Sequence, residues 1–105
     1  MTEQPLVAVA LFSLKEGRTV EGYRELSREV IRPGMAKMPS VTGFVDYDVA
    51  GSMSESTEGW ELAEVVQITS AEEFERDNTQ MPGKAVADVW NEWVDKSLVL
   101  YLREL

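Results

Sequence analysis

Carboxylates and phenols are our leading candidates for acid and base chemistry in this sequence, because the chain has no cysteine and no histidine. Their absence excludes thiolate metal sites, disulfides, a cysteine nucleophile and the usual Ser-His relay. A carboxyl enclosed by apolar walls has a raised pKa, so it can donate a proton near neutral pH and later take one back. Our candidate catalytic residues are Glu61, Glu64, Asp46 and Tyr47.

Alternation of side chains along residues 60–68 indicates which carboxyl could meet a ligand. Glu61 lies on the same face of the predicted strand as small and polar side chains, which leave room for a ligand. Glu64 shares its parity with leucine, valine and isoleucine, a set suited to packing under helices, where an unpaired carboxylate is costly. We therefore prefer Glu61 and keep Glu64 as the second choice. For Asp46 and Asp48 the alternative is that both simply face solvent at a sheet edge.

Aromatic side chains and one amide are the candidates for contacting an apolar substrate. We expect substrate contacts from Tyr23, Gln67, Trp60, Trp90 and Tyr101. For Tyr23 the alternative is a core position, where its hydroxyl would need a partner. At 100° per residue Trp90 and Trp93 share one face of a helix, so Trp90 could instead only anchor that helix against a sheet. We find no phosphate loop, metal-ligand spacing or nucleophile elbow, and we expect neither metal nor cofactor.

The elements that must position these residues follow from changes in hydrophobic period. The order strand, helix, strand, strand, helix, strand predicts an α+β ferredoxin-like βαββαβ sandwich, a four-stranded antiparallel sheet with helices on one face. Thr19 and Ser70 are the expected N-caps, and Pro33 with Gly34 is expected to end the first helix. We treat residues 1–105 as one domain. The strands are expected in residues 6–14, 40–51, 60–68 and 98–105, and the helices in 19–32, 69–78 and 85–97.

The first and last predicted strands carry apolar side chains at both the odd and the even positions, so both of their faces are apolar. Such strands need cover on both faces of the sheet, and a chain of 105 residues has nothing left for the second face. We therefore predict a homodimer in which two sheets pack into a barrel with a cavity between them. A flat aromatic or pyrrole-type substrate would suit such a cavity.

Three short motifs resemble the dimeric α+β-barrel superfamily: Val41-x-Gly43-Phe44, then residues 60–63 (Trp-Glu-Leu-Ala), then Thr69-Ser70 ahead of Phe74. The length, the Trp-Asn-Glu-Trp helix and the acidic character are most similar to the RedY-like proteins of prodiginine and related pyrrole pigment pathways. The resemblance implies natural-product biosynthesis, in particular a cyclodehydration that closes a pyrrole-type ring. The superfamily also implies a cofactor-free monooxygenase of the antibiotic-biosynthesis type, and a non-catalytic small-molecule binding dimer stays open.

The sequence departs from the superfamily at residues 78–86, where members commonly carry a histidine and this chain has none. Haem-degrading or histidine-dependent chemistry is therefore not expected. The net charge of −9 opposes binding to nucleic acid or to an anionic membrane. The N-terminus lacks the basic region of a signal peptide, so we expect a soluble cytoplasmic protein.

Overall fold

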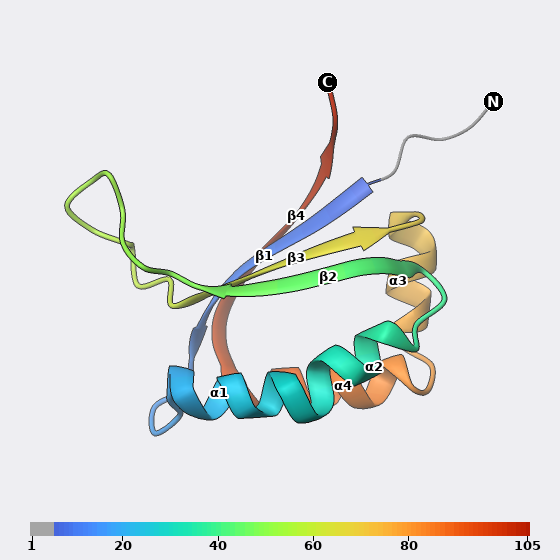
Figure 1. The fold of residues 1–105 in the computed structure, drawn as a ribbon, viewed down its shortest axis with the longest axis horizontal. Helices are drawn as coiled ribbons and strands as arrows, with labels where there is room; N and C mark the ends of the chain where they lie inside the picture. Colours follow the sequence, from blue (N-terminus) through green and yellow to red (C-terminus); the bar gives the residue numbers. More distant parts are fainter. Residues whose placement is uncertain (1–5) are drawn as a thin grey trace.

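Two layers make up the structure, an antiparallel sheet and a set of helices on one of its faces (Figure 1). This computed structural model describes residues 6–105. Residues 1–5, which include the acidic start on which the expectation of no signal peptide depends, lie outside the described residues. The strands are β1 (Leu6–Leu14), β2 (Val41–Asp48), β3 (Leu62–Ile68) and β4 (Val94–Arg103), in the order β2-β3-β1-β4. The predicted ferredoxin-like α+β fold is confirmed. Within the described residues every helix is too short or too polar to span a bilayer.

The first helical segment runs further than its sequence predicts. It comprises α1 (Val20–Leu26), a π-helical turn η1 (Ser27–Ile31) and α2 (Arg32–Ala36), without a break between them. Pro33 was expected to end the helix, but the helix continues through it, and the wider π-helical turn η1 directly precedes the proline. The N-cap prediction is confirmed, since the Thr19 side chain accepts a hydrogen bond from the Gly22 N–H.

The second helical segment consists of α3 (Ala71–Asp77) and α4 (Gly83–Trp93). Ser70 caps α3 as predicted, accepting from the Glu73 N–H. The prediction that the last helix continues to residue 97 is wrong. Val94 is extended and begins β4, because its partner Leu14 and the hydrogen bond from the Lys15 N–H to the Trp93 carbonyl draw this segment into the sheet.

The hydrophobic core lies between the sheet and the helices. Phe12 of β1 is fully buried at its centre, with ring centroids 5.3 Å from Tyr23 and 5.2 Å from Trp90 in edge-to-face contact. Trp93 meets Tyr23 in the same manner at 6.2 Å. Both tryptophans of α4 therefore pack inward, as their helical spacing predicts.

The other face of the sheet is uncovered in the single chain, and we call it the open face. In Figure 1 the helices lie on one side of the sheet, and no helix of residues 6–105 covers the other side. Strand register puts the following side chains on the open face: Val7, Val9, Leu11, Val45, Tyr47, Ala63, Val65, Leu98, Leu100 and Leu102. A continuous apolar surface of this kind marks a site of association.

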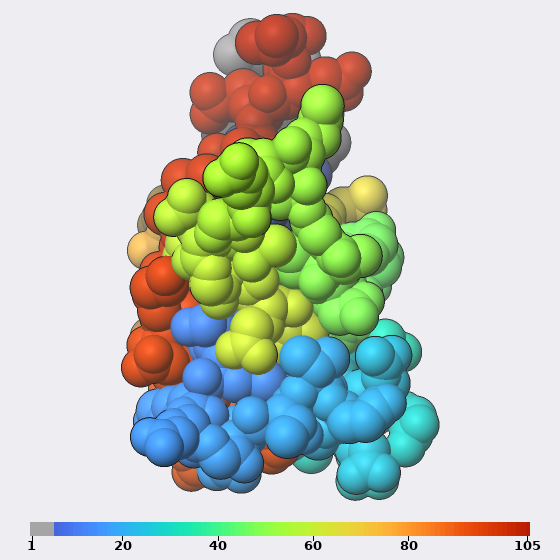
Figure 2. All heavy atoms as spheres, turned by 90° about the vertical axis from the view of Figure 1, so that its left-hand side faces the viewer, coloured from blue at the N-terminus to red at the C-terminus, as the bar shows by residue number. Residues whose placement is uncertain are grey.

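The connection between β2 and β3 is the longest loop of the fold, at residues 49–61. It stands out from one end of the sheet and, in yellow-green, lies above the blue and cyan helical segment in Figure 2. Serine hydroxyls hold it internally, as in the hydrogen bond between Ser52 and Ser54. The half-buried Trp60 closes its C-terminal end beneath the Lys96 ammonium group.

The close approach of α2 to α4 depends on Gly34, which faces Val86. A Cβ at Gly34 would overlap the Val86 side chain, whose branched Cβ leaves it little freedom to move. Gly34→Ala is expected to lower the free energy of unfolding by about 1–2 kcal/mol, because overpacking outweighs the gain of roughly 1 kcal/mol in helix propensity. Urea denaturation measures the change. Gly51→Ala is the control, since a Cβ there meets nothing, and equal stability of both variants would contradict the prediction.

Candidate functional site

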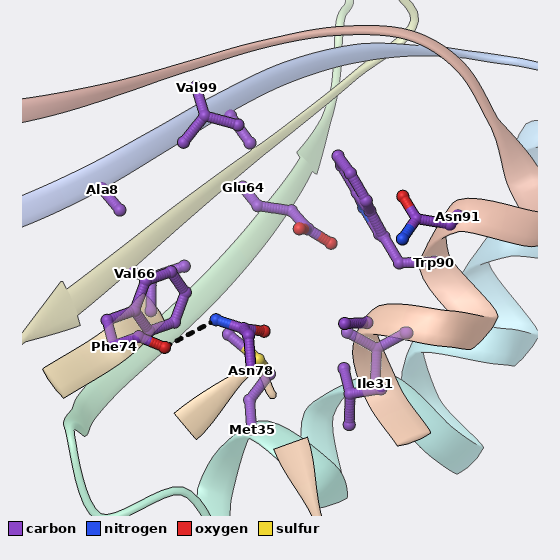
Figure 3. A pocket seen from close by; sticks show the side chains of 13 residues that line it. Ala8, Ile31, Met35, Glu64, Val66, Phe74, Asn78, Trp90, Asn91 and Val99 are labelled. Carbon is purple, nitrogen blue, oxygen red and sulfur yellow. Dashed lines mark hydrogen bonds between the residues drawn. The ribbon is translucent and has the colours of Figure 1, made fainter. Parts of the chain in front are cut away.

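An apolar pocket of about 240 Å³ lies between the sheet and the helices, on the side opposite the open face (Figure 3). The sequence places a ligand cavity between two sheets, whereas this pocket lies within one chain. Small side chains make room for it, since Ala8 and Ala10 of β1 and Ala87 of α4 stand where larger residues would fill the space. The rest of its wall comes from Ile31, Met35, Glu64, Val66, Phe74, Asn78, Val86, Trp90, Asn91 and Val99.

Glu64 is the one carboxylate in the wall of this apolar pocket. It lies on the helix-facing side of β3 between Leu62 and Val66, and only 6% of its surface is exposed. Its Oε2 accepts a hydrogen bond of 2.5 Å from the Tyr23 hydroxyl. Burial raises the pKa of Glu64 to about 7, the Tyr23 hydrogen bond works against that rise, and the charge of Asp46 adds to it. Glu64 can therefore serve as both acid and base near neutral pH.

Trp90 presents its ring to the same pocket, close to Glu64 (Figure 3). Its indole Nε1 is buried and has no hydrogen-bond partner among the described residues. The indole N–H lies near enough to the Tyr23 hydroxyl to influence its pKa, but without the geometry of a hydrogen bond. A buried donor without a partner favours a ligand that brings an acceptor atom to this end of the pocket.

A second, polar pocket of about 170 Å³ lies on the other side of Tyr23. Its floor holds Asp46, which is directly opposite Glu64 in the β2–β3 register. Arg32 binds the Asp46 carboxylate through two nitrogens, at 2.6 and 3.2 Å, and the Ser27 hydroxyl donates to it. The alternative that Asp46 faces solvent is wrong, since these partners leave its side chain 9% exposed, whereas Asp48 is exposed.

The chain matches the family described as REDY-like protein HapK over residues 6–105. It belongs to this family. Three solved structures similar to this REDY-like protein share its fold at low identity. A protein of Arabidopsis thaliana is 19% identical with a TM-score of 0.80, covering 96% of each chain. A Dabb family protein from Mesorhizobium loti is 18% identical with a TM-score of 0.72, covering 98% of this chain and 99% of the other.

HapK from Hahella chejuensis is 13% identical with a TM-score of 0.71, covering 90% of this chain and 89% of the other. No curated protein matches this REDY-like chain in sequence. The predicted resemblance to RedY-like proteins is thus confirmed at the level of family and fold. At these identities the solved structures establish the fold alone.

In this REDY-like protein four of the predicted site residues come together: Glu64, Tyr23, Trp90 and Asp46. Tyr47 borders the polar pocket at the edge strand β2, but strand register turns its side chain to the open face.

The remaining predicted residues lie elsewhere in the REDY-like fold. The Glu61 carboxylate accepts a hydrogen bond from the Leu14 N–H at 3.0 Å, and Glu61 lines neither pocket. Gln67 is exposed on the open face. The Tyr101 hydroxyl donates to Glu75 at 2.8 Å, outside both pockets. Trp60 stacks under Lys96 Nζ, 4.5 Å from its ring centroid.

Sequence reasoning did not identify five polar residues of the two pockets: Arg24, Ser27, Arg32, Asn78 and Asn91. The i,i+3 spacing predicts that Arg32 pairs with Glu29 on the helix surface, but Arg32 binds Asp46 of a distant strand instead. Asn91 falls on the outer side of the predicted helix, yet it lines the apolar pocket. Within residues 6–105 no group of three acidic side chains converges in a way that could hold a metal ion.

Proposed function

We propose that this REDY-like protein is a cofactor-free enzyme of prodiginine-like or other pyrrole-type pigment biosynthesis, which removes water from a small cyclic precursor with Glu64 as its acid and base. The observation that carries the proposal is a single carboxyl in an otherwise apolar pocket, with its pKa raised to about 7. Perturbed carboxyls of this kind are typical of catalytic sites.

Removal of water would proceed as a proton exchange around Glu64. The protonated carboxyl donates its proton to the departing hydroxyl oxygen, the carbon–oxygen bond breaks, and water leaves. The resulting carboxylate takes the proton from the neighbouring carbon, and the electron pair of that C–H bond forms the new double bond. Glu64 ends the cycle protonated, so the reaction needs no further reagent.

The shape and chemistry of the apolar pocket support a small, flat substrate. Its volume of about 240 Å³ lies below the usual range for drug-sized ligands, which fits one or two five- or six-membered rings. Trp90 offers a ring face for stacking and an unpaired N–H for a carbonyl or hydroxyl oxygen. Asn78 is held at the wall by donating to the Phe74 carbonyl at 2.8 Å.

We further propose that the protein is a homodimer joined through the open face. The exposed leucines of β4 and the apolar side chains of β1 would otherwise face water. Solved structures of the same fold from Bacteroides fragilis and Thermobifida fusca are described as dimeric, at 13% and 10% identity. Two active sites per dimer would then lie on the outer, helical sides.

Replacing Glu64 by glutamine tests the catalytic proposal. The amide keeps the size of the side chain but cannot exchange a proton, so turnover of a hydroxylated pyrroline precursor is expected to fall roughly 100-fold or more. Absorbance of the aromatic product measures the rate. Glu61→Gln is the matched control and is expected to keep the wild-type rate, because Glu61 lines neither pocket.

Two outcomes would contradict this assignment. Unchanged turnover in Glu64→Gln would remove Glu64 from the mechanism. Tight binding of the precursor by the wild-type protein without any product would instead favour a non-catalytic binding dimer.

A further inference from the structure

The protonation state of Glu64 raises a problem for any enzyme that uses it. With a pKa of about 7, the carboxyl is ionised in about half of the molecules at neutral pH. A flat ligand in the apolar pocket would cover Glu64 and separate it from the water that enters through that pocket. A molecule that binds its ligand with Glu64 ionised would then stay inactive, unless a proton can arrive by another route.

Tyr23 forms the boundary between the two pockets. Its hydroxyl donates to Glu64, which lines the apolar pocket, while its own side chain lines the polar pocket. The residue is 1% exposed, and its ring packs edge-to-face against Phe12 and Trp93. A phenol oxygen can accept one hydrogen bond while its O–H donates another, and a hydroxyl in this position can pass a proton between its two neighbours.

The polar pocket places charged side chains near Tyr23, and the charge of Asp46 acts on the Tyr23 hydroxyl. Asp46 lies opposite Glu64 on the neighbouring strand and is fixed by Ser27 and Arg32. The charges that act on Tyr23 come from Glu64 of β3 and Asp46 of β2, and the other charged groups of the polar pocket are Asp48 of β2 and Arg24 and Arg32 of the helical segment. From α4 only the rings of Trp90 and Trp93 reach Tyr23, and neither carries a charge.

We propose that the polar pocket is the proton port of Glu64, with the Tyr23 hydroxyl as the link, an inference that rests on the proposed function of Glu64. A hydronium ion in the polar pocket gives a proton to the Tyr23 oxygen while the Tyr23 O–H proton moves to the Glu64 carboxylate. The hydrogen bond then reverses, so that Glu64 donates to Tyr23. Loss of the proton follows the same path backwards, and no other bond changes.

The environment of Tyr23 keeps its hydroxyl neutral, so Tyr23 can pass a proton to Glu64 without itself becoming a tyrosinate. Burial, and then the negative charge of Glu64, raise the pKa of Tyr23 far above its ordinary value, so a tyrosinate does not accumulate. The Asp46 carboxylate, although paired with Arg32, raises the pKa of both Tyr23 and Glu64, so it favours the protonated form of Glu64. Tyr23 is thus a positioning residue, which acts on a substrate only through Glu64.

Proton exchange at Glu64 can be measured by carbon-13 relaxation dispersion of its carboxyl group, at the pH midpoint of each variant. The apolar pocket is filled with indole, a neutral probe, or in a parallel arm by Ala87→Phe, whose ring would occupy the same space. In the wild-type protein with a filled pocket, exchange is expected to continue near its ligand-free rate. In Tyr23→Phe with a filled pocket, exchange is expected to slow at least tenfold.

Tyr101→Phe is the matched control. It removes another tyrosine hydroxyl that donates to a glutamate, but one outside both pockets, and should leave exchange at Glu64 unchanged. Val20→Trp is a second variant, which narrows the polar pocket from the first turn of α1 and leaves the Tyr23 hydroxyl in place. It is expected to slow exchange as Tyr23→Phe does, and it keeps the test open if Tyr23→Phe does not fold.

The possible outcomes separate this inference from the proposed function. If the pocket fills but exchange at Glu64 stops in the wild-type protein, or persists in both Tyr23→Phe and Val20→Trp, the proton port is wrong and the catalytic role of Glu64 stands. If neither indole nor Ala87→Phe alters the carbon-13 shift of Glu64, the pocket takes no apolar occupant, and the proposed function fails together with the port.

Discussion

Between pH 5 and pH 8 the free energy of unfolding is expected to fall by about 2.5 kcal/mol, and Glu64→Gln is expected to remove most of that fall. The folded-state pKa of Glu64 is about 7, against 4.5 for an ordinary glutamate in the unfolded chain. Between these two values the folded state binds more protons than the unfolded state, so stability decreases as the pH rises. At 1.36 kcal/mol per pKa unit the full difference corresponds to about 3.4 kcal/mol, of which roughly 2.5 kcal/mol falls between pH 5 and pH 8.

The contribution of Glu64 to stability is thus fully present below about pH 4.5 and is lost as the pH rises through about 7. Glutamine stays neutral at every pH and can still accept from the Tyr23 hydroxyl. Burial also raises the pKa of Tyr101, to about 12, but that group titrates above this window. Asp77 has a lowered pKa, since Ser40 donates to its carboxylate, and it titrates below the window.

Urea denaturation at pH 5, 6, 7 and 8 and at constant ionic strength measures the effect. Glu61→Gln should follow the wild-type pH dependence, because it makes the same chemical change at a carboxylate outside the apolar pocket. A pH dependence in Glu64→Gln equal to that of the wild-type protein would show that Glu64 is not the buried acid. A more stable glutamine variant at pH 8 would indicate that the protein gives up stability to keep an ionisable group in its core.

Sequence alone predicts most of this fold because its signals are local. Thr19 and Ser70 cap helices through side-chain bonds to N–H groups three residues ahead, and both are confirmed. Alternation in β3 correctly assigns Glu64 to the helix-facing side. The prediction that Pro33 ends the helix is wrong because the helix continues through the proline after the π-helical turn η1, and no local sequence signal distinguishes such a turn from a helix end.

The candidate site is harder to predict, because its geometry depends on pairs that are distant along the chain. The preference for Glu61 assumed that the helix-facing side of the sheet is filled by side chains. Alanines at positions 8, 10 and 87 leave a pocket there instead, and only the docking of α4 on the sheet reveals it. The partner of Arg32 likewise comes from strand register, which brings Asp46 to the helix and sets it opposite Glu64.

Leu100→Glu is expected to convert the proposed dimer into a monomer, raising its dissociation constant by roughly 1,000-fold or more. Leu100 lies on the open face, opposite Val9 in the β1–β4 register, and 48% of its surface is exposed in the single chain. Because both subunits of a two-fold symmetric dimer contribute the same surface, the interface would carry the substitution twice. Each copy then buries a charge against the apolar side chains of the other subunit, which costs several kcal/mol.

Size-exclusion chromatography with light scattering at micromolar concentration measures the mass of each form. Ser97→Glu is the control, since it adds the same charge to β4 on the helix-facing side, where Ser97 is exposed opposite Phe12. A wild-type protein that is monomeric under these conditions would contradict the dimer. If Leu100→Glu separates the subunits and the pH dependence set by Glu64 persists, each apolar pocket is complete within one chain, and the open face serves assembly and not chemistry.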